Sequence, residues 1–329
     1  MRIAVDAMGG DFAPKNEILG AIEAAREKPD TLEVYLVGNE KLIRDFLKSN
    51  NTELNNIKVV DASDVVSMED IPTDTYKTKP YSSMNIALNL LKEKKVDGVV
   101  SVGNTGAFTA NSILKLGRIP GVGRPTTGAL FPTDSGISML FDVGAFVDCR
   151  PNHLYEFAVM GSIYVSHAFG VANPKVGLLS IGEEKNKGNE VTLEAYKLLE
   201  KSKLNFIGNI EGRDILNGKY EVIICDGFTG NIVVKFAESV LGLIKSKFIS
   251  YARKGFLKKI WVGLISKTLK AALKGFDYQD HGGVPLLGVN GVCIIGHGNS
   301  SPLAIKNMIY KAEEMVSKKV NEAIANYFA

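Results

Sequence analysis

Short apolar runs recur along the chain, separated by stretches long enough for a helix. Several runs are apolar without alternation, as at residues 222–225 (Val-Ile-Ile-Cys), which is typical of strands buried on both faces of a parallel sheet. The pattern therefore predicts an α/β fold with a doubly wound, mainly parallel sheet covered by helices. The expected strands are residues 3–5, 34–37, 57–60, 96–102, 137–141, 176–181, 220–225 and 292–295.

Two further segments carry apolar residues at helical spacing. The first stripe is Met84, Ala87, Leu88 and Leu91. The second lies in one long C-terminal helix and comprises Met308, Ala312, Met315, Val316, Val320, Ala323 and Tyr327. We expect both stripes to be core contacts rather than cofactor contacts. The second could equally form a dimer seam, because one sequence does not distinguish burial within a chain from burial between chains.

The composition is that of a chain able to build a large core. It has 329 residues, of which 45% are hydrophobic and 23% are charged. This length predicts about two globular units or one large α/β unit, and we expect a single α/β domain over residues 1–329, with two lobes as an option; the composition excludes a disordered chain. The net charge of +3 is too small for a surface devoted to nucleic acid, so no nucleic-acid partner is expected.

The cysteines and the N-terminus bear on location. Cys149, Cys225 and Cys293 form no C-x-x-C pair, so we expect neither a metal site nor a disulfide framework, and we read these thiols as small core residues in a reducing cytosol. The N-terminus lacks the features of a signal peptide. The apolar stretch at residues 157–173, which has no full charge, is too short and too polar to span a bilayer.

Five loops rich in Gly, Asn, Asp and Ser follow expected strands, at residues 6–11, 103–106, 182–189, 226–231 and 296–301. Each loop alone also fits an ordinary turn or helix cap. Because the carboxyl ends of parallel strands meet at one edge of a sheet, we expect all five loops to share that edge. Free N–H groups at helix N-termini favour an anion there, so phosphate is the expected ligand.

Several other site motifs are missing. No G-x-G-x-x-G follows the first strand, and the chain contains no P-loop, no G-x-S-x-G and no H-E-x-x-H. A dinucleotide, a nucleoside triphosphate, a covalent nucleophile and a catalytic metal therefore lack support, and no cofactor is expected. Among the histidines, His297 lies between two glycines at a strand end and is the candidate for a site residue.

Residues 239–276 contain no acidic residue and nine Lys or Arg residues. Between Gly255 and Gly275, apolar residues recur every three to four positions, which predicts a basic amphipathic helix within a protruding helix pair with an apolar tip. An anionic membrane is one surface for this helix; packing on the protein body and binding of an acidic protein are the alternatives. The expected membrane contacts are Phe256, Leu257, Ile260, Trp261, Leu264 and Ile265.

Five motifs resemble, in order, those of the phosphate acyltransferase family of bacterial phospholipid synthesis, the PlsX family. They are IAVDAMGGD at residues 3–11, SSM at 82–84, SVGNTGA at 101–107, DGFTGN at 226–231 and GGVPLLG at 282–288. The likeness extends to about Ser301. One departure is Phe12, which stands where many relatives have a histidine, so this position is a poor candidate for an essential acid or base.

The resemblance implies transfer of a fatty acyl group from acyl carrier protein to inorganic phosphate. It also implies a homodimer whose fold is similar to phosphotransacetylases and isopropylmalate-type dehydrogenases. The acyl phosphate would pass to a membrane glycerol-3-phosphate acyltransferase, which gives the apolar helix a purpose at an anionic membrane surface. We therefore expect a cytoplasmic protein that associates peripherally with the membrane.

This chemistry needs placed charges more than a covalent nucleophile, because phosphate is an anionic nucleophile and a thiolate leaves readily. On the resemblance we expect residues 9–10 and 104–106, helped by Lys187, to hold phosphate, and Asn231 to stabilise the oxyanion. The expected catalytic residues are Lys187, Asn231, Asn104 and Asp226. The expected substrate-binding residues are Asp6, Gly9, Gly10, Asp11, Ser82, Ser83, Thr105, Gly106, Gly188, Asn189, Gly227 and Gly230.

Three rival functions remain open at this point. The first is phosphotransacetylase-like transfer from acyl-coenzyme A. The second is a redox reaction, which follows from the dehydrogenase-like fold. The third is a non-enzymatic membrane scaffold that uses the basic helix alone.

Overall fold

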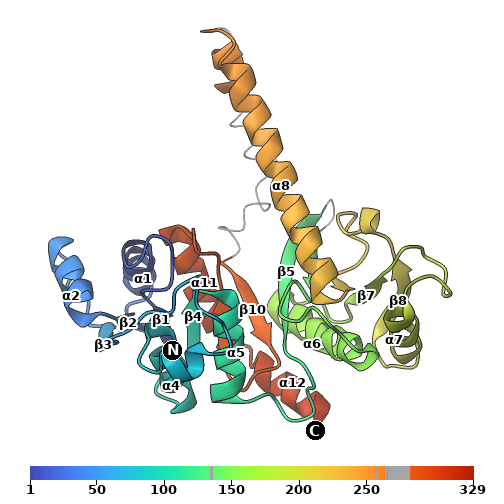
Figure 1. Ribbon diagram of the computed structural model, residues 1–329, viewed down its shortest axis with the longest axis horizontal. Coiled ribbons are helices and arrows are strands. Elements are labelled where there is room, and N and C mark those ends of the chain that lie inside the picture. The colour runs from blue at the N-terminus through green and yellow to red at the C-terminus, as the bar shows by residue number, and fades with distance from the viewer. Residues whose placement is uncertain (134–135, 257, 264, 266–281) are drawn as a thin grey trace.

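The computed structural model describes residues 1–133, 136–256, 258–263, 265 and 282–329. Within them, eleven strands form one sheet with helices on both faces (Figure 1). The strands are β1 (Arg2–Asp6), β2 (Glu33–Gly38), β3 (Ile57–Asp61), β4 (Gly98–Ser101), β5 (Thr126–Thr133), β6 (Gly136–Phe141), β7 (Lys175–Leu179), β8 (Asn205–Ile210), β9 (Val222–Ile224), β10 (Val284–Leu287) and β11 (Val292–Ile295). The helices are α1 (Lys15–Glu27), α2 (Glu40–Ser49), α3 (Thr75–Thr78), α4 (Ser83–Lys92), α5 (Thr105–Leu116), α6 (Pro151–Phe169), α7 (Glu190–Glu200), the short 3-10 helix Gly212–Asp214, α8 (Gly227–Ala252), α11 (Pro302–Ser317) and α12 (Val320–Phe328).

The α/β class and all eight expected strands are confirmed. Three further strands, β5, β8 and β10, did not stand out in the sequence. Gly128 and Pro132 interrupt β5, Gly208 interrupts β8 and Pro285 interrupts β10. These residues are typical of turns, and here tertiary pairing overrides that preference.

The sheet has the order β3-β2-β1-β4-β11-β10-β5-β6-β9-β7-β8. The first five strands in this order, called here the first half, are mutually parallel, and so are the last four, called the second half. Between them lie three successive antiparallel pairings, β11 with β10, β10 with β5, and β5 with β6. The strands of the second half therefore run opposite to those of the first.

This reversal corrects one expectation. The carboxyl ends of β1, β4 and β11 lie at one edge of the sheet, whereas those of β7 and β9 lie at the opposite edge. The five loops consequently do not share an edge. The prediction was wrong because a run of apolar residues carries no strand direction, and two of the strands that make the reversal, β5 and β10, were missed.

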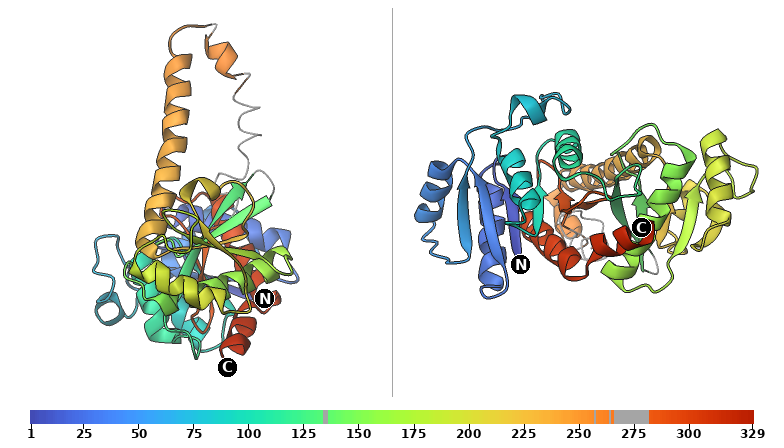
Figure 2. Two further views of the ribbon diagram at one scale, coloured as in Figure 1. Left: turned by 90° about the vertical axis from the view of Figure 1, so that its right-hand side faces the viewer. Right: turned by 90° about the horizontal axis from the view of Figure 1, so that it is seen from below.

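Helices cover both faces of the first half: α1 and α11 pack on one face, and α4 and α5 on the other (Figure 2). The second half has α6 and α7 on one face, and the first turns of α8 pack on the other. The expected stripe on α4 is core, since Met84, Ala87, Leu88 and Leu91 are all buried.

The expected last helix is two helices. Lys319 has a positive φ of 53° and ends the regular run between α11 and α12. Of the predicted stripe, Met308, Ala312, Met315 and Val320 are buried within the chain. Those four positions are therefore core rather than a dimer seam, whereas Tyr327 at the end of the stripe is exposed.

Helix α8 stands out from the body of the molecule (Figures 1 and 2). Its 26 residues make a rod about 39 Å long at 1.5 Å per residue. Near its start, Val233, Val234 and Ala237 pack against a buried cluster on the second half. The remainder projects beyond the sheet, so the expected basic segment begins inside a helix that starts twelve residues earlier, at Gly227.

After α8 the chain turns at Gly255, and residues 256, 258–263 and 265 are helical. Phe256, Ile260, Trp261 and Ile265 are exposed by 77%, 45%, 64% and 44%, so these four do not pack on the body of their own chain. Leu257, Leu264 and the expected helix end at Gly275 lie outside the described residues. No helix in the described part of the chain is long and apolar enough to cross a membrane.

Candidate functional site

The carboxyl ends of β1, β4 and β11 form a rim, called here the first-half rim. Asp6 ends β1 and is buried. Its carboxylate accepts hydrogen bonds from Ser83 Oγ at 2.6 Å and Ser101 Oγ at 2.7 Å. Burial raises the pKa of Asp6, and the two hydroxyls oppose that rise. Asp6 thus ties β1 to β4 and to the start of α4 from beneath the rim.

The loops that follow β1, β4 and β11 meet at this rim, and glycines allow their backbones to touch. A Cβ on Gly9 would lie 2.6 Å from Asp6 Oδ2 and 2.9 Å from the Cα of Gly103. A Cβ on Gly10 would overlap the carboxyl of Glu17 and lie 3.2 Å from the carbonyl oxygen of Gly298. Only glycine fits such close backbone approaches. Three of the five expected loops are therefore brought together at this edge.

Asn104 lies at the start of α5 and is already hydrogen-bonded on both ends of its amide. Its Oδ1 accepts from the N–H of Ala107 at 3.0 Å, and its Nδ2 donates to the carbonyl oxygen of Ser67 at 3.2 Å. The side chain therefore caps α5 and holds the connection between β3 and α4. Thr105 and Gly106 follow it and are exposed, so the positive end of α5 faces solvent beside the rim.

Ser82 and Asp11 also lie at this edge. Ser82 is buried and caps α4, accepting from the N–H of Asn85 at 3.4 Å. Asp11 is exposed, and its N–H donates to the Gly298 carbonyl at 2.8 Å. The first-half rim therefore contains all the expected site residues up to Gly106.

The remaining expected residues lie at the opposite edge, on the second half. Asp226 caps α8 and accepts from the N–H of Thr229 at 2.8 Å. The N–H of Gly227 donates to the carbonyl of Phe146 at 3.0 Å. Asn231 is exposed one turn further along α8, next to Gly144. The start of α8 is thus packed against the loop after β6, while the Asn231 side chain stays accessible.

Asp142 anchors that loop, and sequence reasoning missed it. Its buried carboxylate accepts from Thr127 N and Oγ1 at 3.0 Å each, Ala145 N at 3.2 Å and Phe146 N at 2.8 Å. Burial raises the pKa of Asp142, and these donors oppose the rise. The signal was available, because Asp142 directly follows an apolar strand, as Asp6 ends one.

The loop after β7 presents Lys187. Its carbonyl accepts from Ser180 Oγ at 3.0 Å, which fixes the backbone, and Asn189 two residues later caps α7. Gly188 between them has a positive φ of 132°. The Lys187 side chain is exposed, and the described residues give it no ion-pair partner, whereas Lys185 pairs with Glu200. Of the two lysines, Lys187 is the one available to a ligand.

One contact links the two halves near the rim. His297, on the loop after β11, has its Nε2 3.6 Å from Glu238 Oε1 on α8. Burial lowers the pKa of His297, Glu238 opposes that change and Lys235 adds to it. Helix α8 therefore starts at the second half and passes the first-half rim before it projects.

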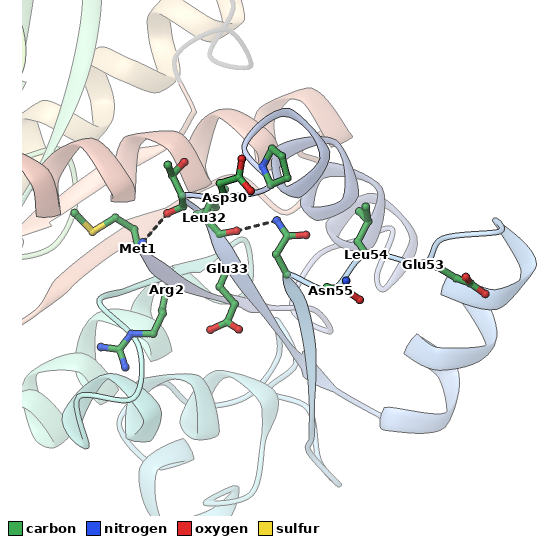
Figure 3. A pocket seen from close by; sticks show the side chains of 11 residues that line it. Met1, Arg2, Asp30, Leu32, Glu33, Glu53, Leu54 and Asn55 are labelled. Atoms are coloured by element: carbon green, nitrogen blue, oxygen red, sulfur yellow. Dashed lines mark hydrogen bonds between the residues drawn. The ribbon is translucent and has the colours of Figure 1, made fainter.

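Two surface grooves lie elsewhere, at the amino ends of the strands. One, of about 580 Å³, is lined by Met1, Arg2, Glu33 and neighbouring residues (Figure 3). The other, of about 640 Å³, follows α2 and β3. Polar groups that line the first already bond to one another, as the Met1 ammonium does to the Thr31 carbonyl at 2.6 Å. Neither groove reaches the rim. Among the described residues, no group of three or more His, Cys, Asp or Glu side chains could hold a metal ion.

Comparison with known proteins gives the family. Residues 1–323 match the model of the family described as "Fatty acid synthesis protein". The chain belongs to this family. A phosphate acyltransferase from Chlorobaculum parvum is 46% identical over 99% of this chain and 98% of that protein. Another from Dictyoglomus turgidum is 46% identical, covering 98% of this chain and 96% of that protein.

Solved structures confirm the fold of this family member. A phosphotransacetylase from Streptococcus pyogenes superposes with a TM-score of 0.65 at 16% identity, covering 98% of this chain and 94% of that chain. A 4-hydroxythreonine-4-phosphate dehydrogenase from Klebsiella pneumoniae gives 0.57 at 11% identity, covering 96% and 98%. The predicted likeness to phosphotransacetylase and dehydrogenase folds is therefore correct.

Proposed function

We propose that this chain is a phosphate acyltransferase that transfers a fatty acyl group from acyl carrier protein to inorganic phosphate. The observation that carries this proposal is the 46% identity, over nearly the whole chain, to relatives named phosphate acyltransferase. The first-half rim supports it, because glycine backbone and the N-terminus of α5 meet there, and such groups suit a bound anion.

In this reaction a phosphate oxygen attacks the thioester carbonyl carbon, the carbon–sulfur bond breaks, and the carrier protein leaves as its thiolate. Gly9 and the exposed start of α5 at Thr105 and Gly106 are assigned to phosphate. Lys187 lies at the other edge of the sheet, so its role as the cation requires phosphate to lie between the two halves, along α8, which starts at the second half and passes the first-half rim. Asn231 is assigned to the oxygen that gains charge in the transition state. Asp6, Asp142 and the Asp226 cap hold the loops from beneath.

The donor and the nucleophile are tested together. Purified protein receives acyl carrier protein or coenzyme A carrying the same acyl chain, with or without phosphate, and hydroxylamine traps acyl phosphate. We expect hydroxamate only with phosphate, and faster with the carrier-protein donor. Faster turnover of acyl-coenzyme A would instead favour the phosphotransacetylase reaction, which the structural likeness makes the second candidate. Absence of hydroxamate with both donors would contradict an acyl transfer to phosphate.

We further propose that the protein is cytoplasmic and docks on an anionic membrane through the tip that follows α8. Phe256 and Trp261 are exposed there beside Lys258 and Lys259, which suits an interface with acidic lipid head groups. This location would hand the acyl phosphate to a membrane enzyme that acylates glycerol 3-phosphate.

We also propose that the protein forms a homodimer through α8. Ile232, Phe236 and Leu243 are exposed along α8 by 51%, 69% and 58%, an apolar surface that a second copy would cover. Sedimentation equilibrium tests this: we expect a dimer that Phe236→Glu converts to monomer, and a monomeric wild type would contradict it.

A further inference from the structure

Glu17 is a buried carboxyl that the proposed reaction does not use. It lies in the first turn of α1 and is only 1% exposed. Oε1 lies against Gly10, so closely that a Cβ on Gly10 would overlap it. Oε2 is buried and has no hydrogen-bond partner among the described residues. An ionised carboxylate in such a place leaves an acceptor unsatisfied, which is costly away from water.

Asp6 shows what a satisfied carboxylate looks like at the same rim. Asp6 lies beneath Gly9 and accepts from two serine hydroxyls. Glu17 lies beneath Gly10, and the part of the chain that the structure describes gives it no hydroxyl donor. The two glycines of this loop therefore each cover a buried carboxyl group, and only one of the two groups is well supplied with donors.

The groups that face Glu17 favour its neutral form. Burial is the main reason that its pKa rises to about 7, and the carboxylates of Asp6 and Asp11 raise it further. The N–H groups of Gly10 and of Glu17 itself oppose the rise. Besides Glu17, the nearest atoms to a Cβ added on Gly10 belong to the Val102 side chain and the Gly298 carbonyl, neither of which titrates.

We propose that Glu17 is a positioning residue for phosphate: protonated, it supports Gly10 without adding charge, and once ionised it weakens phosphate binding at the first-half rim. This inference rests on the proposed function and adds a regulatory group to it. The physical cause is like-charge repulsion through a medium of low dielectric constant, because the ionised carboxylate lies directly beneath the loop assigned to the anion. The proton exchanges with solvent, and no bond to the substrate is involved.

The test compares Glu17→Gln with wild type and with Glu23→Gln, a change at a half-exposed glutamate on the same helix whose carboxylate lies 3.5 Å from Lys306. The KM for phosphate is measured from pH 6 to pH 9. Phosphate itself titrates in this range, equally for all three proteins, so the ratio of wild-type to variant KM isolates Glu17. We expect that ratio for Glu17→Gln to rise about threefold to tenfold across the range, with kcat within twofold, while Glu23→Gln follows wild type.

A flat ratio would overturn the inference, and so would a Glu17→Gln KM that is raised equally at every pH, because that is the mark of a purely structural role. A second measurement uses wild type alone: carbon-13 NMR should find a glutamate carboxyl that titrates near pH 7 and whose pKa rises when phosphate saturates the protein, as linkage requires. If wild type makes no acyl phosphate, the proposed function fails, and the NMR titration still decides whether Glu17 and phosphate are coupled.

Discussion

Both halves of the sheet place a buried aspartate where a strand ends, and they satisfy it differently. Asp142, after β6, accepts from three backbone N–H groups and one threonine hydroxyl. Asp6, at the end of β1, accepts two serine hydroxyls at short range and the Met8 N–H only at 3.4 Å. Two of the backbone donors to Asp142 belong to its own loop and the third to β5, and no side-chain substitution removes them. The first half instead depends on side chains that single substitutions remove.

The difference extends to the next layer. At the second half, Gly227 and Gly230 let the start of α8 pack directly on the loop that contains Asp142. A Cβ on either glycine would overlap a backbone oxygen of that loop. At the first half, Glu17 lies beneath Gly10 with an unpartnered oxygen. The comparison indicates that the second half is mainly scaffold, with Lys187 and Asn231 as its accessible site side chains. The first half holds Glu17, the buried carboxyl with an oxygen that has no partner among the described residues.

The largest effect is expected from Gly230→Ala, which tests the scaffold. A Cβ there would overlap the backbone carbonyl of Asp142, and backbone cannot move aside cheaply, so we expect a loss of about 3 kcal/mol in unfolding free energy. Gly242→Ala is the matched control on the same helix, with no atom near its added Cβ. We expect Gly242→Ala to raise the unfolding free energy slightly, by about 0.5–1 kcal/mol. Equal urea midpoints for the two variants would mean that α8 is not seated as described.

The next effect concerns the accessible side chains of the second half. Replacing Lys187 or Asn231 with Ala should lower kcat/KM for acyl transfer at least about tenfold, because each removes a charge or donor near developing negative charge. Thermal unfolding should be unchanged, since both are exposed. Lys185→Ala, which removes a lysine that already pairs with Glu200, should retain activity. Near-normal rates for both Lys187→Ala and Asn231→Ala would confine the chemistry to the first half.

Glu17→Gln tests, through the pH dependence of the unfolding free energy, whether the first half holds a protonated carboxyl group. The pKa of this group rises from its ordinary 4.5 to about 7 on folding, so the folded state binds the proton more tightly. Wild-type stability should then fall as pH rises between these values, by up to about 3 kcal/mol, and Glu17→Gln should not share that fall. Urea unfolding at pH 5 and pH 8 measures it. If the unfolding free energy of Glu17→Gln changes between pH 5 and pH 8 as that of wild type does, Glu17 is ionised at both pH values in the folded protein.

The smallest effect is expected at the projecting tip. Trp261→Glu should reduce the fraction of protein that floats with anionic vesicles about threefold, because it removes buried apolar area and adds repulsion, and high salt should act in the same direction. Tyr81→Glu, at an equally exposed aromatic residue on the body, is the control. If both variants float like wild type, the tip is not the membrane contact.

The sequence predicted the parts of this molecule that depend on short-range pattern. The apolar runs indicated the positions of eight strands, and Asp6 followed by Gly9 and Gly10 after the first strand indicated the first-half rim. Strand direction depends on β5 and β10, whose Gly and Pro residues disguise them, so the meeting of five loops at one edge was wrong. Asp142 was missed although its pattern repeats that of Asp6. Glu17 was missed for another reason: a glutamate in a helix is usually a surface residue, and only the folded structure, which places it beneath Gly10, buries it.

The most direct test of the account follows both products of one reaction. Acyl carrier protein loaded with a fatty acyl group is mixed with phosphate and enzyme, phosphorus-31 NMR observes the phosphorus, and a thiol reagent counts the freed carrier protein. The account predicts an acyl phosphate signal that grows in step with the thiol and disappears when phosphate is omitted. Thiol release without that signal, or at the same rate without phosphate, would contradict it.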